Sequence, residues 1–223
     1  MTKKVAVLLP SYNEEKTIGL TIDDVLSSVP EADVVVIDNN CTDHTVDVAG
    51  QFGVRVMSCA RQGKGCAIRK AFAEVDADYY VMIDSDYTYP ARHIPEVLRL
   101  LIHRADVVIG YRQWNARGAI ARTNKLGNWG LTKIARVLYG YPVHDVCSGM
   151  WGFRREAVEK IVLQSTGFTL EVELFTEAVR TGCRIEQIPI EYRARFHDSN
   201  SKLRLSTGLE IGWWLLRRKL RES

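Results

Sequence analysis

Short apolar runs alternate with stretches of helical spacing along the first half of the chain. The apolar runs span 5–9, 34–37, 54–57, 79–83 and 106–109, and each reads as a strand. Between the first two runs, Ile18, Ile22 and Val25 recur at the spacing of one helix face. Strands that alternate with helices predict an α/β fold with a mostly parallel central sheet, Rossmann-like, and helices on both faces.

The pattern becomes less regular after residue 110. We expect a helix over 119–139 that is broken near Gly127 and Gly130, and an edge strand over 147–153. Further elements are expected as helices over 155–163 and 170–180 and a strand over 184–192, interrupted at Pro189. The chain is therefore interpreted as one domain over 1–203, in which 1–110 resembles a nucleotide-binding half and 111–203 carries specificity, with a tail at 204–223.

Composition restricts the setting. The chain has 223 residues, a net charge of +3 and five cysteines, with no CxxC pair. This cysteine pattern is typical of a reducing compartment and argues against a disulfide framework or a zinc site. No signal peptide is expected, because the first residues lead straight into a strand. The apolar stretch 211–216 is too short for a bilayer, which needs about 20 residues. We expect a cytoplasmic protein that is soluble or peripheral to the membrane.

Positive charge is concentrated in one stretch. No acidic residue occurs between Asp106 and Asp145, whereas Arg112, Arg117 and Arg122 all fall there. Such a stretch predicts an anionic partner, and these three arginines are candidates for binding a phosphate. The alternative is a solvated basic face. General nucleic-acid binding is not expected from so small a net charge.

Two carboxylates directly follow the apolar run 79–83. Asp84 and Asp86 enter a polar turn that Pro90 closes. Hard divalent cations such as Mg²⁺ or Mn²⁺ prefer carboxylate oxygens, and ligands of open α/β sheets bind at the carboxyl ends of strands. We predict a divalent-cation site at this pair. Taken alone, the pair is equally compatible with a surface turn.

Three further features point to a nucleotide. Asp38 follows the second strand and would accept a hydrogen bond from the ring N–H of uracil or guanine, while Glu14 would hold a ribose hydroxyl. Lys64, in a Gly-Lys-Gly turn before a helix, would face an anion. The alternatives are an Asx turn at Asp38 and a plain glycine turn at Lys64. Neither a P-loop nor a GxGxxG motif is present.

The order of these motifs resembles a known family. PSYNEE at 10–15, DNNCTD at 38–43, GKG at 63–65, DSDYTYP at 84–90, DVCSGMWGFRR at 145–155 and SKL at 201–203 are similar to family 2 glycosyltransferases with the GT-A fold. The resemblance is to the polyprenyl-phosphate (dolichol-phosphate) hexosyltransferases in particular. It covers nearly all of the chain from residue 5 to residue 203.

The resemblance implies roles for individual residues. Asp145 stands where family members often place a base or an essential carboxylate, and Arg195 and Lys202 would reach a phosphate. The residues assigned to the nucleotide sugar are Pro10, Tyr12, Glu14, Ile37, Asp38, Lys64, Asp84, Ser85 and Asp86. The catalytic residues would be Asp86, Asp145, Arg112, Arg195 and Lys202. Two departures are Thr88, where relatives often have glutamine, and an irregular spacing before SKL that leaves Arg193 or Arg195 open.

The implied reaction is an inverting transfer of mannose or glucose from a GDP- or UDP-sugar to a polyprenyl or dolichyl phosphate at the membrane surface. Trp213, Trp214 and the basic residues after them suit a short helix lying on the cytoplasmic face of an anionic membrane. Packing of this tail on the domain core or at a dimer interface is the alternative. Other functions considered are transfer to a soluble acceptor such as phosphoglycerate or a saccharide, and sugar-nucleotide binding without turnover.

Overall fold

A single seven-stranded sheet organises the molecule. The computed structural model describes residues 3–113, 122–167, 169–195 and 205–222. The strands are β1 (Val5–Ser11), β2 (Asp33–Asp38), β3 (Arg55–Ser58), β4 (Tyr79–Met82), β5 (Val107–Arg112), β6 (Trp151–Arg154) and β7 (Ile185–Ile190). The helices are α1 (Ile18–Ser28), α2 (Thr45–Gln51), α3 (Lys64–Glu74), α4 (Ile94–His103), α5 (Arg122–Tyr139), α6 (Arg155–Val158), α7 (Leu170–Arg180) and α8 (Leu205–Glu222), with a 3₁₀ turn, η1 (Ala91–His93), before α4.

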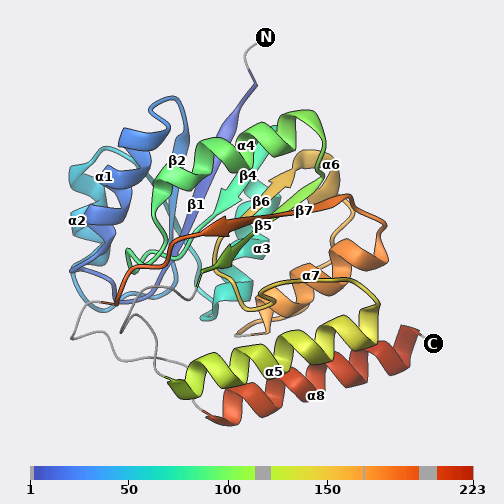
Figure 1. The fold of residues 1–223 in the computed structure, drawn as a ribbon. Coiled ribbons are helices and arrows are strands. Elements are labelled where there is room, and N and C mark those ends of the chain that lie inside the picture. The colour runs from blue at the N-terminus through green and yellow to red at the C-terminus, as the bar shows by residue number, and fades with distance from the viewer. Residues whose placement is uncertain (1–2, 114–121, 168, 196–204, 223) are drawn as a thin grey trace.

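The strand order is β3-β2-β1-β4-β6-β5-β7 (Figure 1). Strands β1, β2, β3 and β4 pair in parallel, as do β5 and β7, while β6 runs antiparallel between β4 and β5. Crossover helices connect the parallel strands, as βαβ units require. The expected mostly parallel sheet is therefore confirmed.

Alternate residues of the strands supply two cores. Ala6 and Leu8 of β1 face one cluster of buried side chains, and Val7 and Leu9 face the other. The first cluster includes residues of α3, α5, α7 and α8, and the second includes residues of α1, α2 and α4. Helices thus cover both faces of the sheet, as expected, and the strands are buried on both sides because of this cover.

Several expectations for the second half are wrong. Strand β7 continues through Pro189, and the helix expected over 155–163 ends at Val158 as α6. Residues 147–153 do not form an edge strand, because β6 (Trp151–Arg154) lies in the sheet interior, where Trp151 and Phe153 are fully buried. The described part of the helix expected over 119–139 is continuous as α5. A side chain at Gly127 or Gly130 would meet no neighbour within 4 Å, so these glycines lower helix propensity without breaking the helix.

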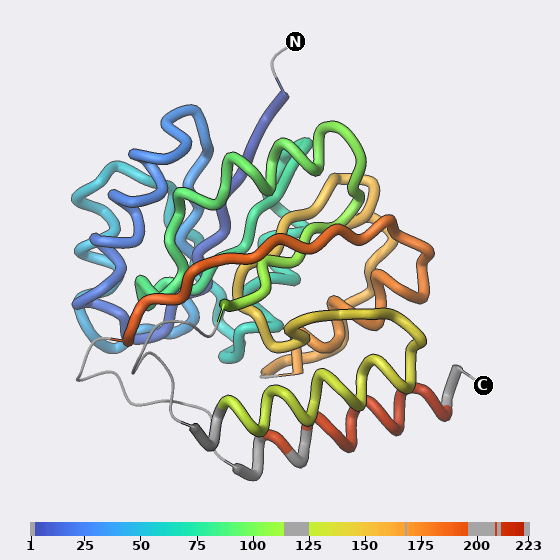
Figure 2. Tube along the Cα trace, viewed as in Figure 1, coloured from blue at the N-terminus to red at the C-terminus, as the bar shows by residue number. Residues whose placement is uncertain are grey.

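Helices α5 and α8 lie side by side along one edge of the molecule (Figures 1 and 2). Leu131 and Ala135 of α5 and Ile211 and Leu215 of α8 are buried in the same core cluster. The tail therefore packs on the domain through one face of α8. None of the helices in the described part of the chain is long and apolar enough to span a membrane.

Candidate active site

The loops that follow β1, β2 and β4 meet at the carboxyl edge of the sheet. The Ser85 hydroxyl donates to the Pro10 carbonyl oxygen over 3.0 Å, and the backbone N–H of Asn39 donates to the Ser11 carbonyl oxygen over 2.9 Å. Because the three strands are parallel neighbours, their polar ends share one edge. The three loops therefore converge at one edge of the sheet.

Asp84 is held by a half-buried lysine, whose side chain has an exposed fraction of 20%. Lys64 Nζ lies 2.5 Å from Asp84 Oδ1 and 2.6 Å from Glu171 Oε1, so one ammonium joins α3, the end of β4 and α7. Burial opposes the charged form of Lys64, but the two carboxylates hold its pKa above the ordinary value. Gly149 packs directly against the Asp84 carboxylate, where a side-chain Cβ would collide.

Asp86 is held by a threonine and an arginine. Its Oδ1 accepts from the Thr88 hydroxyl over 2.5 Å and from the Thr88 amide over 3.2 Å, and Oδ2 lies 2.7 Å from Arg195 Nη2. Burial of Arg195 opposes its charge, yet Asp86 keeps the pKa of Arg195 above its ordinary value. Of the two arginines left open by the sequence, Arg195 is the one that reaches Asp86, and Arg193 instead contacts Asp24 over 2.9 Å.

These contacts suit a divalent cation. Residues 84–88, here called the metal loop, present two carboxylates, each matched by one cationic side chain. The absence of a side chain at Gly149 lets its backbone pack against the Asp84 carboxylate without displacing it. Thr88, the departure from the family pattern, donates its hydroxyl to Asp86. The described residues contain no group of three His, Cys, Asp or Glu around one point, so phosphate and water would complete a coordination shell begun by Asp84 and Asp86.

The residues assigned to the nucleoside lie on the same edge. Asp38 Oδ1 accepts from the backbone amide of Cys41, three residues on, over 2.8 Å, so this carboxylate closes the turn after β2. Glu14 Oε2 accepts from the Thr17 hydroxyl over 3.1 Å, and Pro10 and Tyr12 are half-buried beside it. Two further residues assigned to the nucleotide sugar, Ile37 and Ser85, have buried side chains. Any ligand contact of those two falls mainly to the backbone.

The Gly-Lys-Gly turn has a packing function. Gly63 has a φ of +126°, and a Cβ there would collide with the Thr166 carbonyl, as a Cβ at Gly65 would with the Ser165 carbonyl. The Gly63 amide donates to Asn39 Oδ1 over 2.5 Å, which ties the turn to the loop after β2. The glycine-turn alternative is therefore present. Anion binding by Lys64 stays a prediction.

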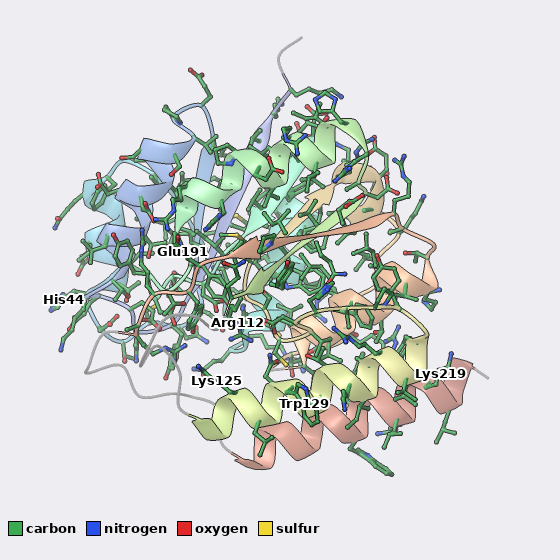
Figure 3. All side chains as sticks on the ribbon, in the orientation of Figure 1. His44, Arg112, Lys125, Trp129, Glu191 and Lys219 are labelled. Carbon is green, nitrogen blue, oxygen red and sulfur yellow. The ribbon has the colours of Figure 1, made fainter. Side chains whose placement is uncertain are left out.

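Arg112 and Asp145 form a buried ion pair. Arg112 Nε and Nη2 donate to the two Asp145 oxygens over 2.6 and 2.9 Å, and Asn128 of α5 donates to Oδ1 over 2.9 Å. Arg112, at the end of β5, is labelled in Figure 3. Burial raises the pKa of the Asp145 carboxyl, but Arg112 and Asn128 outweigh it and the net shift is downward. Asp145 is thus a carboxylate with low affinity for a proton, which favours the essential-carboxylate interpretation over that of a base.

A buried aromatic path links this ion pair to the metal loop. The Tyr89 hydroxyl accepts from the Gly149 amide over 2.7 Å, and the Tyr89 and Tyr192 rings meet edge to face at 5.1 Å. The Arg112 guanidinium lies 5.4 Å from the Tyr192 ring centroid. Tyr89, Tyr192 and Glu171 were missed from the sequence, because nothing in a local pattern shows which distant residues pack together.

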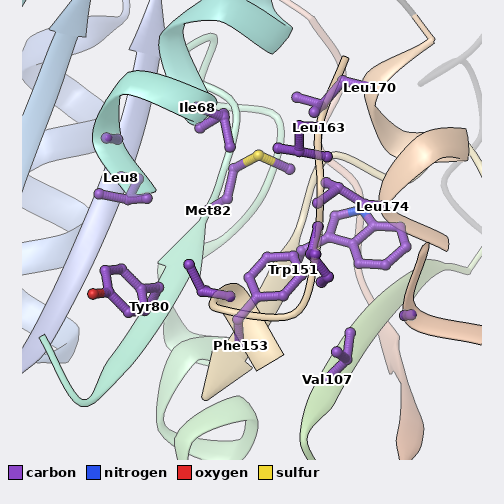
Figure 4. Close-up of a cluster of buried hydrophobic side chains, with 14 of the residues drawn as sticks. Leu8, Ile68, Tyr80, Met82, Val107, Trp151, Phe153, Leu163, Leu170 and Leu174 are labelled. Carbon is purple, nitrogen blue, oxygen red and sulfur yellow. The ribbon is translucent and has the colours of Figure 1, made fainter. Parts of the chain in front are cut away.

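The loop before β6 is anchored in the core beside the site. The Trp151 indole donates to the Ser148 carbonyl over 2.7 Å, and the Trp151 and Phe153 rings are stacked at 6.0 Å (Figure 4). Ser148 is fully buried next to Gly149. Gly149, which packs against Asp84, is therefore supported by the buried residues Ser148 and Trp151. Arg117 and Lys202 lie outside the described residues, and Arg122 is described only as the first residue of α5.

Comparisons with known proteins agree with this geometry. The model of the family "Glycosyl transferase family 2" matches residues 6–162. Two Haloferax volcanii proteins are similar in sequence. Glycosyltransferase AglJ is 34% identical over 204 residues, which cover 89% of this chain and 66% of AglJ. A dolichyl-phosphate hexose transferase is 35% identical over 193 residues, covering 86% of this chain and 83% of that protein. The chain thus spans slightly less than two thirds of AglJ and more of the second relative.

A solved structure shows the same fold. Glucosyl-3-phosphoglycerate synthase from Mycobacterium tuberculosis, in complex with Mn²⁺ and UDP-glucose, superposes with a TM-score of 0.79 at 25% identity. The match covers 97% of this chain and 79% of the synthase. With its converging loops and paired aspartates, this chain belongs to glycosyl transferase family 2 and has the GT-A fold.

Proposed function

We propose that the protein transfers a hexose, mannose or glucose, from a GDP- or UDP-sugar to a polyprenyl or dolichyl phosphate. The observation that carries the donor half of the proposal is the paired arrangement of Asp84 with Lys64 and Asp86 with Arg195 at the edge where three loops meet. A nucleotide diphosphate needs cations beside carboxylates that can hold a metal, and this edge offers both.

The leaving group determines what the site must stabilise. Negative charge develops on the nucleoside diphosphate as the glycosidic bond breaks, and a bound Mg²⁺ or Mn²⁺ would stabilise it as a Lewis acid. Asp84 and Asp86 would hold that cation. Lys64 and Arg195 add fixed positive charge within a half-buried site, where electrostatic stabilisation is stronger than in water.

The nucleophile requires little help from a base. A phosphate monoester has a second pKa of about 6, so its oxygen is mostly ionised near neutral pH. Asp145 therefore need not remove a proton, which agrees with its pairing to Arg112. Direct attack on the anomeric carbon inverts its configuration. Contacts with the acceptor phosphate and with the diphosphate of the donor are proposed for Arg112, Arg117, Arg122 and Lys202.

The choice of a lipid acceptor is supported by the similarity to a dolichyl-phosphate hexose transferase. It is also supported by exposed apolar side chains on the paired helices. The exposed residues are Leu126, Trp129, Ile134 and Val137 on α5 and Trp213, Leu216 and Leu220 on α8. Lys133 lies over Trp129 at 4.1 Å, and Arg217 is exposed beside Leu216. Tryptophan next to basic side chains suits an anionic membrane surface. We propose peripheral association with the cytoplasmic face.

Product analysis tests the proposal. Purified protein is incubated with each of four donors (UDP-glucose, UDP-mannose, GDP-mannose and GDP-glucose), Mg²⁺ or Mn²⁺, and a short polyprenyl phosphate in detergent. We expect a hexosyl polyprenyl phosphate by mass spectrometry with one of the donors. Absence of product with every donor, from a protein whose melting temperature rises with a nucleotide sugar, would contradict the lipid acceptor.

A soluble acceptor is the second candidate. It is favoured by the structural similarity to glucosyl-3-phosphoglycerate synthase. The same assay with 3-phosphoglycerate in place of the lipid distinguishes the two. A product with phosphoglycerate and none with the lipid would establish the second candidate.

A further inference from the structure

Tyr87 lies at the centre of the metal loop in a backbone conformation that bulky residues rarely adopt. Its φ is +62°, in the left-handed region, and its neighbours are Asp86 and Thr88. A residue of this kind persists in that conformation only when surrounding structure holds it there. The orientation of the Asp86 carboxylate therefore depends on contacts that come from outside the loop.

Those contacts come from the segment after β7. The Arg193 backbone amide donates to the Thr88 carbonyl over 2.9 Å, which ties the segment after β7 to the end of the metal loop. The Arg193 guanidinium covers the Tyr87 ring at 4.0 Å from its centroid. Arg193 thus fixes both the backbone after Tyr87 and its side chain.

Arg193 is in turn fixed by a carboxylate on α1. Arg193 Nη1 donates to Asp24 Oδ2 over 2.9 Å, and the same oxygen accepts from the Ala91 amide over 2.9 Å. Asp24 therefore joins the arginine above the metal loop to the first residue of η1, just beyond that loop. Both side chains are mostly shielded from water, with exposed fractions of 21% for Asp24 and 27% for Arg193. A pair with such shielding is screened less than a surface ion pair.

We propose that Asp24 and Arg193 are positioning residues that hold Tyr87 in its left-handed conformation and so aim Asp86 at the metal. The contacts described above join Asp24 and Arg193 to Tyr87, Thr88 and Ala91, whereas Arg195, two positions later, contacts Asp86 directly. This assignment gives separate roles to the two arginines that the spacing before SKL left open. The inference rests on the proposed metal role of Asp84 and Asp86.

Mn²⁺ binding to the purified protein tests it. The variants are Arg193→Gln and Asp24→Asn, with calorimetric titration of Mn²⁺ in the presence of UDP or GDP. We expect each variant to weaken Mn²⁺ binding about tenfold, because both break the Asp24–Arg193 ion pair. Arg193→Gln also removes the guanidinium over the Tyr87 ring, and Asp24→Asn leaves that guanidinium without its anchor. The double variant should be little worse than either single variant, because both act through one contact.

A second readout follows the loop without metal. Hydrogen–deuterium exchange of a peptide that covers residues 84–90 should become faster in Arg193→Gln and Asp24→Asn than in the native protein. Tyr87→Leu removes the ring beneath the guanidinium and leaves the Asp24–Arg193 pair in place. It should also increase exchange in this peptide, and it serves if Arg193→Gln fails to fold.

Arg184 supplies the matched control. It precedes β7 at the opposite end of that strand and forms a two-point pair with Asp106 at 2.8 and 3.0 Å. Arg184→Gln should leave Mn²⁺ binding and exchange of the 84–90 peptide unchanged. If Arg193→Gln and Tyr87→Leu behave like Arg184→Gln, the positioning role is refuted. If Asp86→Ala also leaves Mn²⁺ binding unchanged, the proposed metal site itself fails, and the two failures are thereby distinguished.

Discussion

Arg112 and Asp145 neutralise each other in the interior through two parallel hydrogen bonds. The Asp145 side chain has an exposed fraction of 1% and that of Arg112 10%. Sequence reasoning gave these residues separate tasks, one toward the acceptor and one as a catalytic carboxylate. Their pairing makes each a determinant of the position of the other.

Asp145→Asn should destabilise the protein strongly. The substitution leaves the Arg112 charge buried without its partner, which typically costs about 3–5 kcal/mol. Urea unfolding measures the loss. The control is Glu96→Gln, which breaks an exposed pair with Arg99 and should cost about 0–1 kcal/mol. A loss for Asp145→Asn as small as that of the control would contradict the importance of the pair.

The contribution of Asp145 to the free energy of unfolding should depend on pH. The folded pKa of Asp145 is depressed, so its contribution is present above the unfolded pKa of about 3.9 and is lost as pH falls through the folded value. The free-energy difference between the native protein and Asp145→Asn should be constant from about pH 5 upward and shrink at lower pH. Urea unfolding at pH 7 and pH 3 checks this; a difference that grows on acidification would contradict it.

Removing one metal-loop carboxylate should abolish most activity. Asp86→Asn and Asp84→Asn are each expected to lower kcat by about 10²–10³, the usual effect of losing one electrostatic contact with a transition state. The Mn²⁺-dependent rise in melting temperature with UDP or GDP should disappear as well. Asp47→Asn, which alters an exposed aspartate on α2, is the control. Full activity in either metal-loop variant would exclude that residue as a ligand.

The first half of the fold was predictable because its signals are local. Each apolar run ends in a polar turn, and the parallel order of β1, β2 and β4 follows from βαβ connections. The position of β6 was not predictable in this way. Its sequence is compatible with an edge or an interior strand, and pairing with β4 and β5 from distant parts of the chain decides between them.

Arg218 should be essential to the docking of α8. It contacts Glu173 and Glu177 of α7, whose side chains have no exposure to solvent. Arg218→Met leaves both carboxylates without this cation and should destabilise the protein by about 3–5 kcal/mol. Arg217→Met, at the exposed neighbouring position, is the control. Adding Glu173→Gln and Glu177→Gln to Arg218→Met should recover part of the loss, and no recovery would indicate that packing dominates.

The outward face of α8 should govern membrane binding. Trp213→Ser with Leu220→Ser removes two side chains that are 66% and 78% exposed, so folding should be little affected. Co-sedimentation with anionic liposomes should fall at least about fivefold, because buried apolar area drives interfacial binding. Ile102→Ser, at an exposed apolar position on α4, is the control. Equal binding by all three proteins would exclude this face as the membrane contact.

The site was partly predictable for the same physical reason as the fold. Asp84 and Asp86 stand out because carboxylates directly after a buried strand are a local pattern. Glu171 does not, because its contact with Lys64 joins residues 107 positions apart. Asp38 shows a further limit. One carboxylate can close a turn and face a base, and the sequence does not distinguish these uses.

The antiparallel direction of β6 has a consequence for exchanging parts between relatives. Because β6 runs against β4, its beginning lies at the same sheet edge as the end of β4, and Gly149 arrives beside Asp84. A fragment that stops at residue 110 would leave the edge of β4 unpaired. It would also lack Gly149, which packs against Asp84 of the metal loop. Chimeras that alter the acceptor should therefore keep β6 and the turn before it with the donor half, and exchange only the segments outside that strand.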